Sequence, residues 1–308
     1  MKTFSDYLEE NDIDYHLYGV LNSLKDVVKK VSDVIKTAET GSAGSKNIFG
    51  EEQLALDILA DGFVQKELQK NSLIGIIASE ELPEEMDVSN EETGGGEYGV
   101  CYDPLDGSSL VDVNLAVGSI FGIYKMPNSE GKNSFIGVKG DEQLASMIAV
   151  YGPRTTIVLT VKRGVVEFLL DDGEFYLVRE GIKVGGGKMF APGNLRACAS
   201  RKDYLELINY WCEKQFTLRY SGGMVPDINQ ILLKGKGIFS YPGYGDAPDG
   251  KLRLLFECAP MALLMEQAGG AATDGSMRIL DKKLTRLDQR TPIFIGSKEE
   301  VERCEKYL

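Results

Sequence analysis

The sequence has a single histidine, His16, among its 308 residues. A Ser-His-Asp triad would therefore need His16 as its base, and zinc or iron sites built on imidazole ligands are disfavoured. Its five cysteines are scattered and form no Cys-x-x-Cys pair, which disfavours a disulfide framework and favours a reducing compartment. The chemistry of this chain must then depend mainly on carboxylates, lysines, hydroxyls and tyrosines.

Positive charge is also scarce, because 34 lysines and arginines face 47 aspartates and glutamates, for a net charge of −13. A surface of that sign repels nucleic acid and anionic membranes, so we expect neither as a partner. No apolar run approaches the roughly 20 residues that cross a bilayer, and the first residues show no basic and apolar leader pattern. We therefore expect a cytoplasmic protein that acts on a small molecule.

The pattern of apolar residues predicts an α/β (α+β) protein built in layers. Helices are expected over 15–37 and 51–70, the second with Leu54, Ile58, Leu59 and Phe63 facing inward. Short strands are expected over 73–78 and 98–102, with a polar, glycine-rich mobile loop at 37–50. Strands then dominate up to about residue 178, and helices alternate with short strands in the last third. The glycine-rich stretch 179–194 reads as a junction, so we predict domains 1–185 and 186–308.

Acidic side chains gather where these elements begin or end. Glu80 and Glu81 follow one apolar strand, and "DPLDGSS" (103–109) places Asp103 and Asp106 after the next. Carboxylates at neighbouring strand ends can meet at one edge of a sheet, and hard divalent cations such as Mg²⁺ prefer such oxygen ligands. Two such cations could hold a phosphate for attack by water. The pattern favours metal-dependent phosphate chemistry.

The segment Gly107-Ser108-Ser109 suggests a phosphate seat, since glycine allows close backbone approach and N–H groups at a helix start bind anions. A plain surface turn remains the alternative for this segment, because proline, aspartate and glycine form turns readily. For Glu80 and Glu81 alone, a solvated loop is the simpler interpretation.

Several long motifs make the sequence resemble the fructose-1,6-bisphosphatase and sedoheptulose-1,7-bisphosphatase family. Besides "DPLDGSS", these are "GEEQLALDILAD", "ASEE", "RYSGGMVPDINQ" and "GKLRLLFECAPMALLMEQAGG", in family order from about residue 15 to the end. The segments "YGPRTT" and "KMFAPGNLRA" look most like the sedoheptulose branch. The resemblance implies the layered αβαβα sandwich of the sugar-phosphatase superfamily and a Mg²⁺-dependent sugar-bisphosphate 1-phosphatase.

Carried over by motif, the resemblance implies a role for each site residue. Asp57 and Glu81 would be the catalytic pair that polarises the attacking water. The metal ligands would be Glu51, Glu80, Asp103, the Leu105 carbonyl, Asp106 and Glu257. The substrate contacts would be Gly107, Ser108, Ser109, Asn194, Arg219, Tyr220, Gly222, Met224, Tyr241 and Lys251. The family pattern also implies two or three Mg²⁺ ions per site, with Mn²⁺ as a substitute, and a homodimer or a tetramer.

The sequence departs from relatives in three places. No cysteine precedes residue 100, so the regulatory cysteine pair of chloroplast sedoheptulose-bisphosphatases is missing. Glu97-Tyr98 stands where vertebrate-type enzymes use lysine and tyrosine to bind the inhibitor AMP, so AMP control is not expected. "GNLRA" replaces a pattern with tyrosine in the distal phosphate pocket, and the nearby Arg196 would suit a longer sugar, although it could equally face solvent.

These observations predict hydrolysis of the 1-phosphate of sedoheptulose 1,7-bisphosphate. Three alternatives remain at this stage. One is a fructose-1,6-bisphosphatase or an enzyme of dual specificity, and another is an inositol-phosphatase-like monoesterase that shares the Asp-Pro-x-Asp-Gly element. The third is a catalytically silent sugar-phosphate-binding protein.

Overall fold

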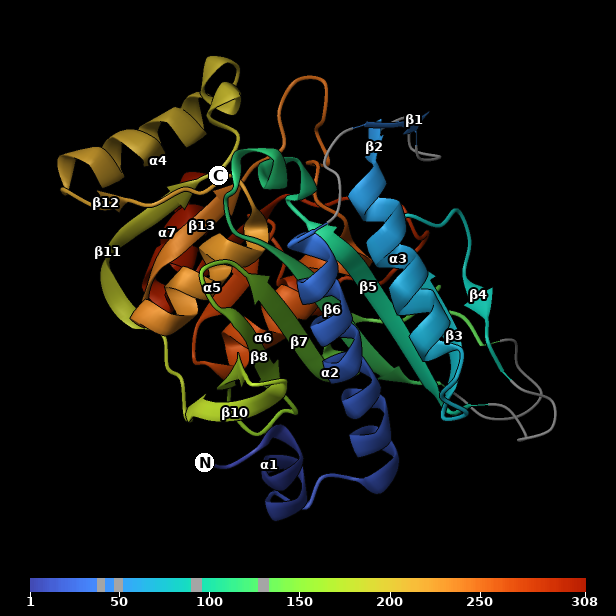
Figure 1. Cartoon of the computed structure of the whole chain (residues 1–308). Coiled ribbons are helices and arrows are strands. Elements are labelled where there is room, and N and C mark those ends of the chain that lie inside the picture. Colours follow the sequence, from blue (N-terminus) through green and yellow to red (C-terminus); the bar gives the residue numbers. More distant parts are fainter. Residues whose placement is uncertain (38–41, 47–51, 90–95, 127–132) are drawn as a thin grey trace.

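The computed structural model describes residues 1–37, 42–46, 52–89, 96–126 and 133–308 (Figure 1). Its helices are α1 (Phe4–Glu10), α2 (Tyr15–Ile35), α3 (Ala55–Leu68), α4 (Lys202–Glu213), α5 (Met224–Lys234), α6 (Ala259–Gln267) and α7 (Lys298–Tyr307). Short helical turns of other types include η2 (Ser108–Val113), η3 (Gly140–Glu142), η4 (Leu195–Ala199), η5 (Leu254–Cys258) and η6 (Ile279–Asp281).

The strands form two main sheets and one small hairpin. The eight-stranded sheet has the order β10-β9-β8-β7-β6-β5-β3-β4, and the five-stranded sheet has the order β12-β11-β13-β15-β14. The strands of the larger sheet are β3 (Ile74–Ser79), β4 (Met86–Asp87), β5 (Tyr98–Asp106), β6 (Val117–Lys125), β7 (Gln143–Tyr151), β8 (Thr155–Thr160), β9 (Val166–Asp171) and β10 (Glu174–Arg179). Those of the smaller sheet are β11 (Gly185–Pro192), β12 (Thr217–Leu218), β13 (Lys236–Tyr241), β14 (Ala271–Thr273) and β15 (Ile293–Gly296). The hairpin pairs β1 (Ser42–Lys46) with β2 (Glu52–Leu54).

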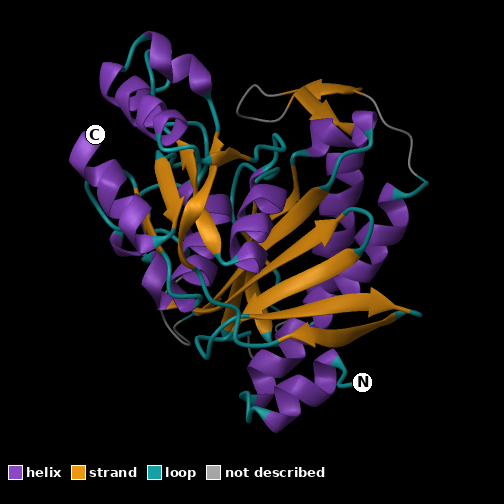
Figure 2. Ribbon diagram, turned by 90° about the vertical axis from the view of Figure 1, so that its left-hand side faces the viewer, coloured by secondary structure: helices purple, strands orange, loops and turns teal. Residues whose placement is uncertain are grey.

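The elements stack in five layers, so the predicted αβαβα sandwich is confirmed. Helices α1, α2 and α3 share a core with one face of the larger sheet. Helices α5 and α6 fill the space between the two sheets, and α4 and α7 cover the outer face of the smaller one. Figure 2 shows the strands in two groups, with helices between them and on either side. Because helices cover both faces of the larger sheet, every residue of β5 is buried.

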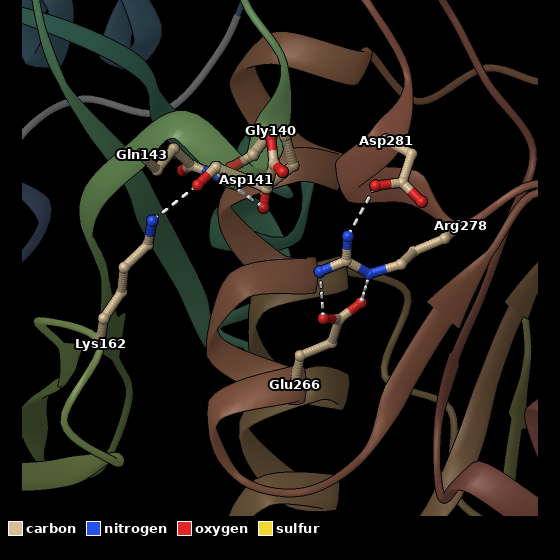
Figure 3. A network of polar contacts seen from close by, with 8 residues as sticks. Gly140, Asp141, Gln143, Lys162, Glu266, Arg278 and Asp281 are labelled. Atoms are coloured by element: carbon tan, nitrogen blue, oxygen red, sulfur yellow. Dashed lines mark hydrogen bonds and ion pairs between the residues drawn. The ribbon is translucent and has the colours of Figure 1, made fainter.

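Polar contacts hold α6 against β7 at one end and against the segment before η6 at the other. The Gln143 side chain on β7 donates hydrogen bonds to the carbonyls of Gly140 (2.7 Å) and Ala259 (3.0 Å). At the other end of α6, Glu266 accepts two hydrogen bonds from Arg278 (Figure 3). The turn η5 runs directly into α6, so these contacts also fix the position of η5.

Some expectations about local structure were wrong. The predicted loop at 37–50 contains strand β1. In α3, the predicted inward residues Ile58 and Leu59 are 45% and 46% exposed, while Leu56, Asp57, Ala60, Asp61, Val64 and Leu68 are buried. Apolar residues occur on both faces of α3, so their spacing could not select the inward face.

Within the described residues, no helix is long and apolar enough to cross a membrane. The proposed domain boundary between residues 185 and 186 falls inside β11 and stays a prediction.

Candidate active site

Two parallel strands bring acidic residues to one edge of the larger sheet. Strand β3 ends at Ser79, and Glu80 and Glu81 follow it. Strand β5 extends four residues beyond the predicted end, so Asp103 and Asp106 lie within it. Ser79 pairs in register with Tyr102, and the Glu80 N–H donates to the Tyr102 carbonyl at 3.1 Å. This register sets Glu80 beside Asp103.

Three buried carboxylates come together at this edge. Oxygens of Asp103, Asp106 and Glu257 all lie within 4.8 Å of one another. Glu257 reaches the cluster from η5, a single π-helical turn packed against β5. Such turns are rare and often occur at functional sites. The structure therefore joins residues that are more than 150 positions apart in the sequence.

Backbone N–H groups hold each of these carboxylates in place. Asp103 accepts from Leu105 at 2.9 Å and Asp106 accepts from Val225 at 2.6 Å. Glu257 turns back and accepts from the N–H of Arg253 at 2.5 Å. The three side chains are thus oriented by the backbone.

The cluster is electrostatically unfavourable without a cation. Burial, followed by the charges of Asp106 and Glu257, raises the pKa of Asp103 well above its usual range. Burial raises the pKa of Asp106 to about 6, against the opposing effect of its hydrogen bonds from the backbone. Buried carboxylates of this kind are normally paired with cations or coordinate metals, so the donor set fits a hard divalent ion.

Arg253 contributes a buried positive charge beside this cluster. Its guanidinium forms an ion pair with Glu80, and its side chain is 2% exposed. Only the fold shows that Arg253 contacts both Glu80, which follows β3, and Glu257 on η5.

The proposed catalytic aspartate lies at the start of α3. Asp57 is in the first turn and is buried, and its Oδ2 accepts a hydrogen bond from the Ser108 hydroxyl at 3.1 Å. Glu81, half-buried after β3, donates its N–H to the Ser79 hydroxyl at 3.1 Å. The structure thus brings α3, the end of β3 and the segment after β5 together.

The segment Gly107-Ser108-Ser109 forms the turn from β5 into η2. Gly107 has φ +76°, and a Cβ there would lie 3.3 Å from Leu110 Cδ1 and 3.4 Å from Gly223 Cα. Glycine removes both the strain and the crowding. The first N–H groups of a helical turn lack intrahelical acceptors, which suits an anion at Ser108 and Ser109.

A cavity of about 220 Å³ opens beside the cluster. It is lined by Glu80, Asp106, Gly107, Tyr220, Gly222, Gly223, Met224, Phe239, Tyr241, Lys251, Leu252, Arg253 and Glu257. Nine of these thirteen residues were predicted from the sequence as site residues. A larger cavity of about 610 Å³, lined by residues such as Glu84, Asn133 and Arg286, includes none of them.

Other predicted residues surround this cavity without lining it. Asn194 is half-buried, and its amide donates to the Pro242 carbonyl at 3.5 Å. Arg219 is exposed, and its guanidinium donates to the Leu218 carbonyl at 3.0 Å. Leu105 is buried next to the cluster. Glu51 lies outside the described residues.

Two buried aspartates near the site were missed by the sequence analysis. Asp227 on α5 accepts hydrogen bonds from the Ser221 N–H at 2.9 and 3.2 Å and so fixes the segment that carries Gly222. Asp61 on α3 accepts hydrogen bonds from Ser79 and Tyr102. The spacing of Asp57 and Asp61, one helical turn apart, was the only sequence signal for the second residue.

Comparison with known proteins gives a consistent result over nearly the whole chain. The family models for the N-terminal and C-terminal domains of fructose-1-6-bisphosphatase match residues 4–180 and 184–308. A class 1 fructose-1,6-bisphosphatase of Trichlorobacter lovleyi is 46% identical over 307 residues, which cover 99% of this chain and 94% of the relative. A chloroplastic sedoheptulose-1,7-bisphosphatase of Triticum aestivum is 42% identical over 309 residues, covering 99% and 76%. The holo crystal structure of Leishmania major fructose-1,6-bisphosphatase superposes with a TM-score of 0.93 at 33% identity, covering 99% of this chain and 98% of that one.

Proposed function

The chain belongs to the fructose-1,6-bisphosphatase family and is a phosphatase of sugar bisphosphates, and we propose that it removes the 1-phosphate of fructose 1,6-bisphosphate in the presence of Mg²⁺. One observation carries the proposal: three converging carboxylates, from Asp103, Asp106 and Glu257, stand at the edge of a cavity that also presents Lys251 and Arg253. Acidic groups suited to metal ions and basic groups suited to phosphate thus share one small space.

The choice of sugar differs from the sequence-based expectation. The motifs favoured sedoheptulose 1,7-bisphosphate, but the class 1 fructose-1,6-bisphosphatases of several bacteria are 44–46% identical to the chain, against 42% for the wheat sedoheptulose-1,7-bisphosphatase. The similarities therefore support the six-carbon substrate better. Sedoheptulose 1,7-bisphosphate is retained as a second substrate because the wheat relative matches 99% of this chain.

Family relatives use divalent metal ions, and this chain has the side chains to hold them. We assign Glu80, Asp103, Asp106, Glu257 and the Leu105 carbonyl as Mg²⁺ ligands, with Glu51 as a further ligand outside the described residues. The fit rests on the buried, mutually repelling carboxylates of Asp103 and Asp106, whose raised pKa values a cation would lower again. When bound, such ions neutralise phosphate charge and make a nearby water more acidic.

The chain itself supplies the groups that move the proton and hold the phosphate. In our proposal the carboxylates of Asp57 and Glu81 accept the proton of the attacking water. The hydroxyl of Ser108, which donates to Asp57 at 3.1 Å, links this pair to the phosphate seat formed by Gly107, Ser108 and Ser109. No covalent intermediate is required, so a trapped phosphoenzyme would contradict the mechanism.

The remaining site residues are proposed to recognise the rest of the substrate. Lys251 and Met224 would contact the sugar together with Gly222, and all three line the cavity. Tyr220 and Tyr241 also line it and can donate phenolic hydrogen bonds to the distal phosphate without adding charge. Asn194 and Arg219 would complete that pocket.

We further propose a homodimer in which Arg219 reaches the site of the neighbouring subunit. The support is its position, since Arg219 is exposed and, within the described residues, its guanidinium donates a hydrogen bond to the adjacent Leu218 carbonyl alone. A reducing cytoplasm suits the chain because Cys101, Cys198, Cys212, Cys258 and Cys304 are all free thiols.

Phosphate release from three compounds tests the proposal. With Mg²⁺, we expect faster release from fructose 1,6-bisphosphate than from sedoheptulose 1,7-bisphosphate, and almost none from inositol 1-phosphate. The reverse order of the two bisphosphates would restore the sedoheptulose preference. Activity on inositol 1-phosphate alone would move the protein to a different branch of the superfamily.

A further inference from the structure

A buried carboxylate one turn below Asp57 connects three segments of the site. Asp61 is 6% exposed and lies on the inward face of α3, four residues after Asp57. Its Oδ1 accepts hydrogen bonds from the Ser79 hydroxyl at 2.8 Å and from the Tyr102 hydroxyl at 2.9 Å. Its Oδ2 accepts from the Gln65 amide at 2.5 Å. Three donors therefore converge on a single buried acid.

The two hydroxyl donors occupy special positions in the sheet. Ser79 and Tyr102 are register partners on the parallel strands β3 and β5, and both are buried. Ser79 directly precedes Glu80, and Tyr102 directly precedes Asp103. Asp61 thus accepts a hydrogen bond from each strand, in both cases from the residue before a proposed metal ligand. Helix α3 runs alongside these strands in Figure 1.

The hydrogen-bond network of Asp61 also includes the turn that carries Glu81. The Ser79 hydroxyl, which donates to Asp61, also accepts the Glu81 N–H at 3.1 Å. The Glu80 N–H meanwhile donates to the Tyr102 carbonyl. The backbone N–H groups of Glu80 and Glu81 are therefore bound by Tyr102 and Ser79, the two residues whose hydroxyls donate to Asp61.

A packing role alone does not account for a carboxylate at this place. Burying a carboxylate is costly unless its oxygens are satisfied, and burial raises the pKa of Asp61 against the effect of its three hydrogen bonds. An apolar side chain would fill the same space without that cost, but it could not link α3 to both strand ends. The buried carboxylate is explained by a need to place the neighbouring acidic groups accurately.

We propose that Asp61 is a positioning residue, which through Ser79 and Tyr102 sets the distance and orientation of Asp57 on α3 relative to Glu80, Glu81 and Asp103. The inference rests on the proposed function, since it concerns the same metal and proton-transfer groups. Asp61 itself is neither in the carboxylate cluster nor in the lining of the cavity. Removing a group that orients metal ligands in this way commonly lowers metal affinity or activity by about 10- to 100-fold.

Substitutions of differing severity test the proposal. Asp61→Ala should lower kcat by about 10- to 100-fold and weaken Mg²⁺ binding, measured both by calorimetry and as the Mg²⁺ concentration for half-maximal activity. KM for the bisphosphate should change less than about threefold, because the cavity residues Tyr241 and Lys251 lie on other elements. Asp61→Asn should recover most of both losses, since its amide oxygen can still accept from Ser79 and Tyr102.

Two milder variants and a control keep the result interpretable. Tyr102→Phe and Ser79→Ala each remove one donor and should show smaller losses of the same kind, which serves if Asp61→Ala does not fold. Glu300→Ala is the matched control, because Glu300 is also buried and accepts hydrogen bonds from Trp211 and Arg303 on the outer side of the smaller sheet. It should lose stability but keep kcat and Mg²⁺ affinity.

The outcomes separate the two proposals. If the folded Asp61 and Tyr102 variants keep wild-type kcat and Mg²⁺ affinity, or if Asp61→Asn is as impaired as Asp61→Ala, the positioning role is wrong. If the wild type binds Mg²⁺ but hydrolyses no sugar bisphosphate, the proposed function fails. Calorimetry of Mg²⁺ alone still decides whether Asp61 orients the metal ligands.

Discussion

At the scale of single residues, the site is defined by carboxylates whose charge is not balanced within their own cluster. Asp103, Asp106 and Glu257 lie within 4.8 Å of one another in a buried environment. Each is oriented by a backbone N–H group, so the acidic side chains are held together despite their repulsion. This arrangement favours a bound cation over the metal-free state.

The substitution Asp106→Asn tests this interpretation most directly. Its amide oxygen can still accept the Val225 N–H, so we expect the fold to survive while turnover falls more than about 100-fold through loss of a metal ligand. In the wild type, Mg²⁺ at 100 times its Kd should stabilise the fold by about 2.7 kcal/mol, visible as a rise in Tm. That rise should shrink strongly in Asp106→Asn.

Asp281→Asn provides the control for this experiment. Asp281 lies on η6, is exposed, pairs with Arg278 and is not part of the carboxylate cluster. It should keep both turnover and the Mg²⁺-dependent rise in Tm. Retained turnover in Asp106→Asn would remove Asp106 from the proposed set of metal ligands.

At the scale of secondary structure elements, the ends of strands and the first turns of helices carry the chemistry. Strands β3 and β5 place Glu80 beside Asp103, α3 contributes Asp57 in its first turn, and η5 contributes Glu257. Helix α5 approaches from the opposite side, where its Val225 N–H binds Asp106. The first turn of α5 also contains the buried Asp227.

Asp227 makes the stability of this part of the fold depend on pH. Burial raises its pKa from about 3.8 to about 6 in the folded protein. The folded state therefore binds its proton more tightly than the unfolded state, and the stability that this gives is present below pH about 4 and lost as pH rises through about 6. A shift of this size corresponds to about 2–3 kcal/mol.

The substitution Asp227→Asn should remove that dependence while preserving the hydrogen bond from the Ser221 N–H. Urea unfolding at pH 4 and pH 7 in the absence of metal measures the effect. We expect the stability of Asp227→Asn relative to wild type to increase by about 2–3 kcal/mol between these pH values. A difference between the two proteins that does not change with pH would show that Asp227 is charged throughout.

At the scale of the whole molecule, the proposed dimer determines where Arg219 acts. The guanidinium is exposed and lies next to Leu218 and Tyr220, which are also exposed at 55% and 45%. An arginine in such a place can bind a phosphate in a neighbouring site without entering its own. In the proposed dimer, Arg219 of one subunit therefore supports catalysis in the site of the other subunit.

Heterodimers of Arg219→Ala and Asp106→Asn subunits, co-expressed with different tags, test this arrangement. Each homodimer should be strongly impaired. The heterodimer should regain about half of the wild-type activity, because one of its two sites combines an intact Asp106 with an intact Arg219 from the other subunit. A heterodimer as inactive as both parents would mean that Arg219 acts within its own subunit, and failure to isolate one would count against the dimer.

The chemical class of the protein could be predicted from the sequence because the relevant groups are local. Glu80 and Glu81 directly follow an apolar strand, and Asp103 and Asp106 stand three residues apart on the next one, so their convergence needed only the pairing of two neighbouring strands. The family motifs then pointed to a sugar bisphosphatase, and the matched family models and relatives confirmed that family.

Only the tertiary structure decided which side chains surround those groups. The inward face of α3, and with it Asp61, could not be chosen from a helix that is apolar on both sides, because burial depends on what packs against it. Likewise, the contact of Arg253 with Glu80 joins segments far apart in the sequence. Local patterns specify strands, helices and motifs, whereas hydrogen bonds to buried charges form only between elements that the whole fold brings together.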